Sequence, residues 1–244
     1  MRQVLIGALF GALVSAPGHA QLQKGITTRV PFVGCRSDGQ LGPQRAPKVR
    51  HTPILPLDAA QQLAFYAASD GLGVLAPRGW HCFGVYGSNG SGLVVTPEKL
   101  VPGEFFKQHQ FSTKGYGVEL TYDYGGTSGR WAVAEAIARY FPRHRSFIQQ
   151  NFQGLEVGPL PSGPYPHDSF ARRTDTLVQY TTPPMAQGSG TVWVLAPSTE
   201  PVEGLSMLVN ESDGPDLLRV NVRLPRAYRA LAKTILGNAE HEVH

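Results

Sequence analysis

Three residues carry the side-chain types of a hydrolase site: His81, Ser91 and Asp123. An imidazole can serve as general base, a serine hydroxyl or a water as nucleophile, and a carboxylate can orient the imidazole. No motif ties the three together, because Asn89 stands two residues before Ser91, where a nucleophile elbow has glycine. They define one hypothesis, a hydrolase that acts on an envelope or extracellular substrate.

His81 has a second interpretation. It lies in an apolar stretch, 79–86, where Phe83 and Val85 share its face and Trp80 lies on the other. A strand covered on both faces is typical of the middle of a sheet. The pattern therefore favours His81 as a buried core residue rather than as a base.

Glu119 and Asp123 share one face of an alternating stretch, 116–124. Four strand residues at ~3.3 Å each separate them by about 13 Å, more than the roughly 5–9.5 Å of a glycosidase carboxylate pair. We interpret both as solvated surface carboxylates. The spacing of His241 and His244 does not fit a metal-binding helix, and we expect no metal and no cofactor.

The densest run of basic residues lies between Leu217 and Lys233, a stretch without any acidic side chain. Two of its arginines share one face of an expected strand, and two more basic residues lie one turn apart on the helix that follows. Such a stripe can attract anionic polymers or membrane surfaces, and it can equally be a solvated face. The candidate binding residues are Arg219, Arg223, Arg226, Arg229 and Lys233.

The chain begins with a targeting pattern. Arg2 precedes an apolar run over 4–16, and small residues close the run within 17–20. This pattern is typical of a secretory signal peptide, and the run is shorter than the roughly 20 residues of a membrane span. We predict cleavage after Ala20 and an exported protein, periplasmic or secreted, without a transmembrane segment in the mature chain.

Export to an oxidising compartment bears on the two cysteines, Cys35 and Cys82. A lone pair there is most simply a disulfide. Closing a loop of about 47 residues would remove roughly 4 kcal/mol of unfolded-state entropy. The alternative is a reactive thiol, because the neighbours Arg36 and His81 provide a cationic setting that lowers a thiol pKa.

Composition limits the class of protein. Of 244 residues, 41% are hydrophobic and 16% are charged, with 28 glycines and 20 prolines. That balance permits a core and suits a domain of turns and short strands. The formal net charge of +4 is weak support for nucleic-acid binding, which we do not expect of an exported protein.

Helical spacing and end signals predict helices at 58–69, 128–141, 143–152 and 226–236. Within the second of them, Glu135 and Arg139 form a favourable i,i+4 pair.

Strand-like runs fill much of the remainder. Two runs flank a polar turn and predict a hairpin. A later series separated by turn residues predicts an antiparallel meander. The hairpin runs are 79–86 and 92–96, a single strand follows at 116–124, and the meander comprises 173–181, 191–196, 205–210 and 217–224.

Helices and strands do not alternate regularly, which favours an α+β fold with a mainly antiparallel sheet packed with three to four helices. After the signal peptide, 1–20, we expect an extended Pro-rich segment over 21–56, strand-like only at 30–33. A single α+β domain then covers 57–238, and 239–244 form a disordered tail.

The stretch APRGWHCFGVYGSNGSGL at 76–93 resembles a segment of bacterial exported proteins of unassigned function, and the C-terminal strands resemble them more loosely. The resemblance implies a periplasmic location and brings no activity, cofactor or catalytic residue.

These observations favour a non-catalytic envelope or extracellular protein that binds a macromolecule or an anionic envelope component. Another protein is a further candidate partner. The hydrolase built on His81 is the alternative.

Overall fold

The computed structural model describes residues 26–48, 50–69, 73–100, 112–153, 159–211 and 214–241. The predicted signal peptide, its cleavage site and residues 242–244 of the predicted tail lie outside this part of the chain. The described residues form an α+β fold with mostly antiparallel sheets, which confirms the predicted class. None of their helices is long and apolar enough to cross a membrane.

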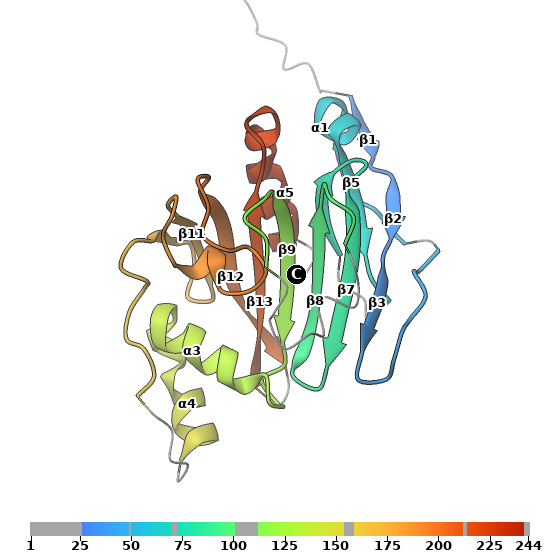
Figure 1. Ribbon diagram of the computed structural model, residues 1–244. Helices are drawn as coiled ribbons and strands as arrows, with labels where there is room; N and C mark the ends of the chain where they lie inside the picture. Colours follow the sequence, from blue (N-terminus) through green and yellow to red (C-terminus); the bar gives the residue numbers. More distant parts are fainter. Residues whose placement is uncertain are drawn as a thin grey trace, which may run out of the picture.

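An eight-stranded sheet forms the centre of the fold (Figure 1). Its order from edge to edge is β10-β11-β12-β13-β9-β8-β7-β3, and every neighbouring pair is antiparallel except β3 and β7. The predicted hairpin is confirmed as β7 and β8. The strands are β3 (Arg36–Gly39), β7 (His81–Gly87), β8 (Gly90–Thr96), β9 (Gly117–Asp123), β10 (Ser169–Arg172), β11 (Leu177–Thr182), β12 (Val202–Glu211) and β13 (Gly214–Arg223).

The meander differs from its prediction in one strand. The predicted strand at 191–196 is instead a 3-10 turn, η2 (Ser189–Thr191), followed by irregular chain. The buried carboxylate of Glu119 accepts the backbone N–H groups of Val194 and Leu195, and an isolated parallel bridge joins Leu195 to Thr113. The fourth strand of the meander is β10, whose four residues are all exposed and show no alternation of burial.

The N-terminal Pro-rich segment is part of the fold rather than an extended cover, so that expectation is wrong. It supplies four short strands: one takes the edge of the main sheet, one joins a three-stranded sheet, and two pair with each other. Its prolines fall between these strands or at a strand end, where they forbid a helix without interrupting a ladder. Besides β3, the strands are β1 (Thr27–Arg29), β2 (Phe32–Gly34) and β4 (Ile54–Pro56).

Only the first half of the predicted helix 58–69 is helical. α1 (Leu57–Gln62) ends where β5 (Leu63–Ala67) begins, and β5 pairs with β2 on one side and β6 (Gly73–Pro77) on the other. All five residues of β5 are buried. A continuous apolar run is typical of a strand covered on both faces and also of a buried helix, so periodicity alone does not separate the two.

The two middle helices are confirmed with shifted ends. α3 (Arg130–Tyr140) and α4 (Arg145–Phe152) are separated by a short 3-10 turn, η1 (Pro142–His144). The proline that was expected to end the first helix begins this turn.

The last helix extends further than predicted. A 3-10 helix, η3 (Arg226–Leu231), leads into α5 (Ala232–His241), so residues 239–241 are helical rather than disordered. Buried Ala239 packs in the same core as Ile235, and this packing continues the helix past Gly237.

The main sheet is covered on both faces. One face packs against α5 and the three-stranded sheet, in a core that includes Val118, Val220 and Ile235. The opposite face packs against α3 and α4, in a second core that includes Ile137 and Phe147. Figure 1 shows these two helices on the half of the sheet formed by β11, β12 and β13.

The predicted disulfide joins Cys35 and Cys82, with an S–S distance of 2.09 Å and a Cα–Cα distance of 5.5 Å. It links the chain between β2 and β3 to β7. Because the chain has only these two cysteines, the reactive-thiol alternative is wrong.

Candidate functional site

The structure does not bring the three predicted hydrolase residues together. His81 is exposed at the start of β7, so the expectation of a buried core histidine is wrong. Ser91 pairs with Tyr86, five residues along β7, which is about 16 Å at ~3.3 Å per residue. Ser91 and Asp123 lie on opposite faces of the sheet, because Ser91 pairs with Tyr122, the residue before Asp123.

The five candidate basic residues do not form one surface. Arg219 and Arg223 extend from β13 toward the face that carries α3. Arg226, Arg229 and Lys233 belong to η3 and α5, which pack on the opposite face. Arg223 is only 1% exposed, which removes it from any exposed patch.

The polar face of β9 and β13 is buried rather than solvated. Glu119 is 1% exposed, so the expectation of a surface carboxylate is wrong. Its Oε2 accepts the backbone N–H groups of Val194 and Leu195, both at 3.0 Å, and its Oε1 accepts Nδ2 of Asn221 at 2.8 Å. Burial raises the pKa of Glu119, although these three donors act in the opposite direction.

Arg223 anchors the adjoining chain through its donors. Its Nη2 donates to the carbonyl of Ala196 at 2.5 Å, and its Nη1 donates to the carbonyls of Gly115 at 3.1 Å and Thr113 at 3.5 Å. Burial lowers the pKa of this guanidinium, and the charge of Glu119 opposes that effect. Arg223 and Glu119 are therefore a buried cation and a buried anion on neighbouring strands, and their charges stabilise each other. Each also forms hydrogen bonds with backbone groups of the chain that packs on them.

Two further polar side chains fix the first turn of segment 188–196. Asp168 accepts the N–H of Ser189 and the hydroxyl of Thr182, both at 2.8 Å. The same Thr182 oxygen accepts the N–H of Gly190 at 2.9 Å. Side chains thus accept the backbone N–H groups that a neighbouring strand would accept in a sheet. The segment is a fixed wall on the α3 face of the sheet.

Trp193 projects from this wall and lies against Gly92 of β8. A Cβ added to Gly92 would lie 2.5 Å from Cη2 of the indole, so only glycine allows the ring to come this close. Two cavities, of about 320 and 520 Å³, share Trp193 and Arg219 in their linings. We call the two cavities together the α3 cleft. Other residues of its lining include Ser91, Asp123, Glu135, Arg139, Tyr165, Gln187 and Ser206.

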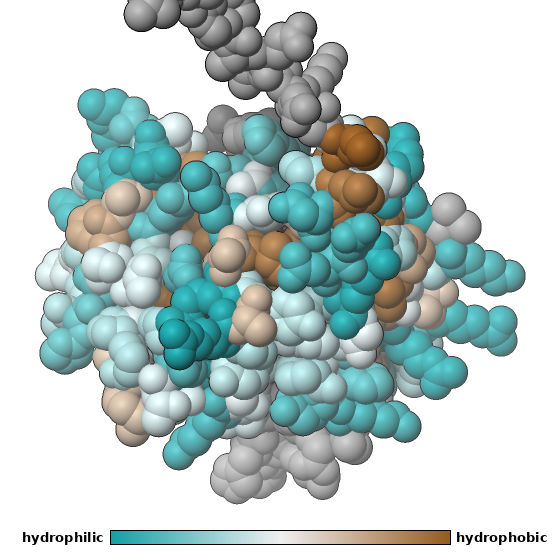
Figure 2. Space-filling model, turned by 90° about the horizontal axis from the view of Figure 1, so that it is seen from above, coloured by the Kyte–Doolittle hydropathy of each residue, from teal (hydrophilic) through white to brown (hydrophobic). Residues whose placement is uncertain are grey.

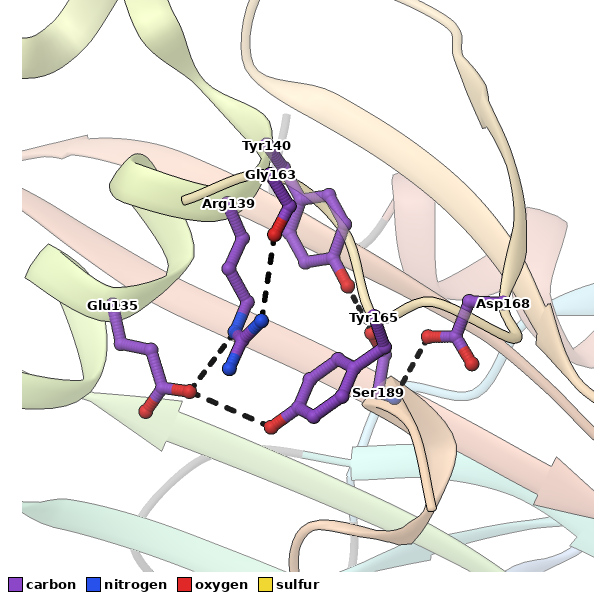
Figure 3. Close-up of polar contacts among 7 residues, drawn as sticks. All are labelled: Glu135, Arg139, Tyr140, Gly163, Tyr165, Asp168 and Ser189. Carbon is purple, nitrogen blue, oxygen red and sulfur yellow. Dashed lines mark hydrogen bonds and ion pairs between the residues drawn. The ribbon is translucent and has the colours of Figure 1, made fainter. Parts of the chain in front are cut away.

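The wall of the cleft opposite Trp193 is built on α3. Arg139 donates from Nε to Glu135 at 3.0 Å, which confirms the predicted i,i+4 pair. The guanidinium carbon of Arg139 lies 3.8 Å from the centre of the Tyr165 ring, and Nη1 donates to the carbonyl of Gly163 at 3.4 Å. Figure 3 shows the Tyr165 hydroxyl turned toward the same carboxylate of Glu135, at 3.5 Å. These contacts join the chain around Tyr165 to α3.

Tyr140 links α3 to the turn at Ser189 through a hydrogen bond between the two hydroxyls (Figure 3). Burial raises the pKa of Tyr140, and the bond to Ser189 acts against that rise. Asp168 does not activate the Ser189 hydroxyl in this arrangement, because its oxygens accept a backbone N–H and the hydroxyl of Thr182. The contacts position the wall rather than activate a nucleophile.

Each charged side chain that lines the α3 cleft, among the described residues, has a partner of opposite sign. Arg219 donates from Nη2 to Asp123 at 2.8 Å, and Arg139 pairs with Glu135. Burial raises the pKa of Asp123, although the charge of Arg219 lowers it. The cleft therefore presents donors and acceptors side by side with little net charge.

No family model, curated protein or solved structure matches this chain. The resemblance of 76–93 to exported proteins therefore stays a prediction. The residues that the structure describes also contain no group of three or more His, Cys, Asp or Glu side chains placed to hold a metal ion. The geometry of the α3 cleft is the remaining guide to function.

A group of exposed apolar side chains also lies away from the α3 cleft. Ile26 just before β1, Ile54 on β4 and Leu57 on α1 are exposed, at 73%, 57% and 36%. Figure 2 shows brown atoms gathered at the corner above β1 and α1, while the rest of that view is mostly polar.

Sequence reasoning named three residues of the cleft lining, Ser91, Asp123 and Arg219, as candidate site residues, and it gave the others no site role. Trp193 lay in a run assigned to a strand, and Tyr165 lay in a Pro/Gly-rich loop. An aromatic residue in turn-rich chain is a usable signal, because no regular element there requires a large apolar side chain. The pairing of Glu135 with Arg139 was predicted only as support for a helix.

Proposed function

We propose that this chain is a non-catalytic binding protein, exported after removal of residues 1–20, that holds a segment of an envelope or extracellular saccharide in the α3 cleft. The observation that carries the proposal is the lining of the cleft. Aromatic side chains stand beside charged groups that are already paired with each other.

A saccharide suits such a lining for two reasons. Its hydroxyl groups both donate and accept, and each ion pair of the cleft offers donors and acceptors together. Its ring has an apolar C–H face that can pack on an aromatic face such as that of Trp193. A site built to bond hydroxyl groups also discriminates well, because its polar groups lose their partners when the wrong ligand binds.

A simple anion suits the cleft less well. It would have to compete with Asp123 for Arg219 or with Glu135 for Arg139, and both pairs are at hydrogen-bonding distance. The basic residues on η3 and α5 lie on the other face of the sheet and cannot assist. These facts favour a neutral, hydroxyl-rich segment over an anionic component.

The hydrolase alternative has less support. His81 is exposed and about 16 Å from Ser91 along the ladder, estimated from the strand rise. The disulfide, in contrast, supports the proposed export, because such bonds persist in oxidising compartments.

A titration with chitotetraose, cellotetraose and maltotetraose tests the proposal, with binding followed by calorimetry. We expect saturable binding of at least one tetrasaccharide, weakened roughly tenfold or more in Trp193→Ala. Trp131→Ala is the matched control, because Trp131 lies on α3, is 44% exposed and packs on Phe152 instead. Far-UV circular dichroism checks that both variants fold.

Two outcomes would contradict the proposal. One is the absence of binding by all three sugars at millimolar concentration. The other is binding that survives in Trp193→Ala as strongly as in Trp131→Ala.

A further inference from the structure

A second feature lies at the far edge of the main sheet, away from the α3 cleft. β10 is the last strand of the eight and pairs only with β11. All four of its residues are exposed, and within the described chain no strand pairs with its outer side. An unpaired strand edge is a template for another extended chain.

The register identifies which backbone groups of β10 are open. The N–H of Arg173 donates to the carbonyl of Leu177 at 2.9 Å, and this pair closes the β10–β11 hairpin. Hydrogen-bonded and non-hydrogen-bonded pairs alternate from there along an antiparallel ladder. The N–H and C=O groups of Phe170 and Arg172 therefore point away from β11, toward the open edge.

A cavity of about 620 Å³ lies beside this edge, on the face of the sheet that carries α5. Ala171 and Gln179 of the hairpin and Lys233 and Leu236 of α5 are among its lining residues. A strand added to β10 would direct every second side chain toward this cavity. The edge thus offers backbone partners, and the cavity offers room for side chains.

Charge indicates what kind of chain fits. Arg172 ends β10 and Arg173 follows it; both are exposed, and the Arg172 guanidinium also donates to the carbonyl of Tyr140 at 2.8 Å. A second copy pairing through the same edge would bring four arginines together, and only four residues of strand would hold it. The carboxylates of the cavity lining are Glu203 and Glu240, and Glu240 accepts a hydrogen bond from Gln179 at 2.6 Å.

We propose that β10 takes up an extended acidic segment of a partner protein by strand addition, with its alternate side chains in the cavity beneath α5. This proposal is independent of the saccharide site. The two sites lie on opposite faces of the sheet, so one protein could hold a polymer in the α3 cleft and a partner at its edge.

The test uses a hexapeptide of alternating glutamate and valine, its lysine–valine counterpart, and the acidic peptide N-methylated at alternate residues. Binding is followed by two-dimensional NMR and by amide hydrogen exchange. We expect the acidic peptide to bind roughly tenfold more tightly than the lysine peptide and to protect the amides of Phe170 and Arg172. N-methylation of the edge-facing amides should abolish this protection.

Arg173→Glu supplies the charge test, since the Arg173 side chain is exposed and lines the cavity. We expect it to weaken the acidic peptide at least severalfold, whereas Arg145→Glu on α4 should not. Equal binding of both peptides overturns the proposal. So does binding without protection of the two amides, or protection that grows with protein concentration in the absence of peptide, which would indicate a second copy.

Discussion

Removing the Glu119 carboxylate should detach the wall that carries Trp193. In Glu119→Ala the N–H groups of Val194 and Leu195 and the amide of Asn221 lose their acceptor inside the protein. Each buried donor left without a partner costs about 1–3 kcal/mol, and breaking a buried charge network costs about 3–5 kcal/mol. We therefore expect the free energy of unfolding to fall by about 3–5 kcal/mol.

Glu119→Gln should cost less, and its cost has a defined origin. An amide oxygen placed at Oε2 still accepts both backbone N–H groups, but the amide nitrogen then faces Nδ2 of Asn221. Turning Asn221 over would break the bond that the Tyr180 hydroxyl donates to Oδ1 at 2.8 Å. One bond is lost in either case, so a cost of about 1–3 kcal/mol is expected.

Urea unfolding gives these values, and amide hydrogen exchange at Val194 and Leu195 reports the wall directly. Asp175→Ala is the control, because Asp175 is exposed and pairs with the exposed Arg143. A loss below about 1 kcal/mol in Glu119→Ala, with unchanged exchange at the two amides, would refute the anchoring role of this carboxylate.

The raised pKa of Glu119 also predicts the direction in which the stability of the fold changes with pH. The folded protein takes up a proton on Glu119 at a pH where the unfolded chain does not, so this group stabilises the fold increasingly as pH falls from neutrality toward 4.5. Its contribution is fully present below the unfolded value and is lost as pH rises through the folded value. Comparing the unfolding free energies of wild type and Glu119→Gln at pH 5 and pH 7 isolates it, and a smaller gap at pH 5 would contradict the sign.

Three further changes have defined outcomes. Gly92→Ala should displace the Trp193 ring from β8 and weaken saccharide binding. The displacement should shift the tryptophan emission while the circular dichroism spectrum stays the same, and an unchanged emission spectrum would contradict the contact. Gly237→Ala should raise the free energy of unfolding by roughly 0.5–1 kcal/mol, because Gly237 lies inside α5 with nothing within 4 Å of an added Cβ. Serine at both Cys35 and Cys82 should lower the free energy of unfolding, measured in urea, by roughly 4 kcal/mol. A change below about 1 kcal/mol would show that the loop between the two residues is already ordered in the unfolded chain.

Alternation along β13 and β9 was enough to predict which side chains share a face. Val118 and Leu120 lie in the core that packs on α5, and Arg219 and Arg223 lie on the other side. What covers that other side was not predictable, because the cover is the irregular segment 188–196. No periodicity marks a segment whose backbone N–H groups bond to side chains distant in sequence. A polar strand face buried under such a segment therefore has the same sequence pattern as a polar face exposed to solvent.

The same limit explains the error at β5. Its five apolar residues follow a short helix without a turn signal, and their partners, β2 and β6, differ in strand direction. The choice between helix and strand therefore depended on two neighbours rather than on the segment itself.

The polar face of the sheet divides between two roles that experiment can separate. Glu119 and Arg223 are almost fully buried and touch backbone, so their loss should lower stability and binding together. Gln187 is exposed and lines the cleft, so Gln187→Ala should weaken saccharide binding while leaving urea unfolding within about 0.5 kcal/mol of wild type. If Gln187→Ala instead lowered stability and left binding unchanged, the α3 cleft would be a consequence of packing rather than a site.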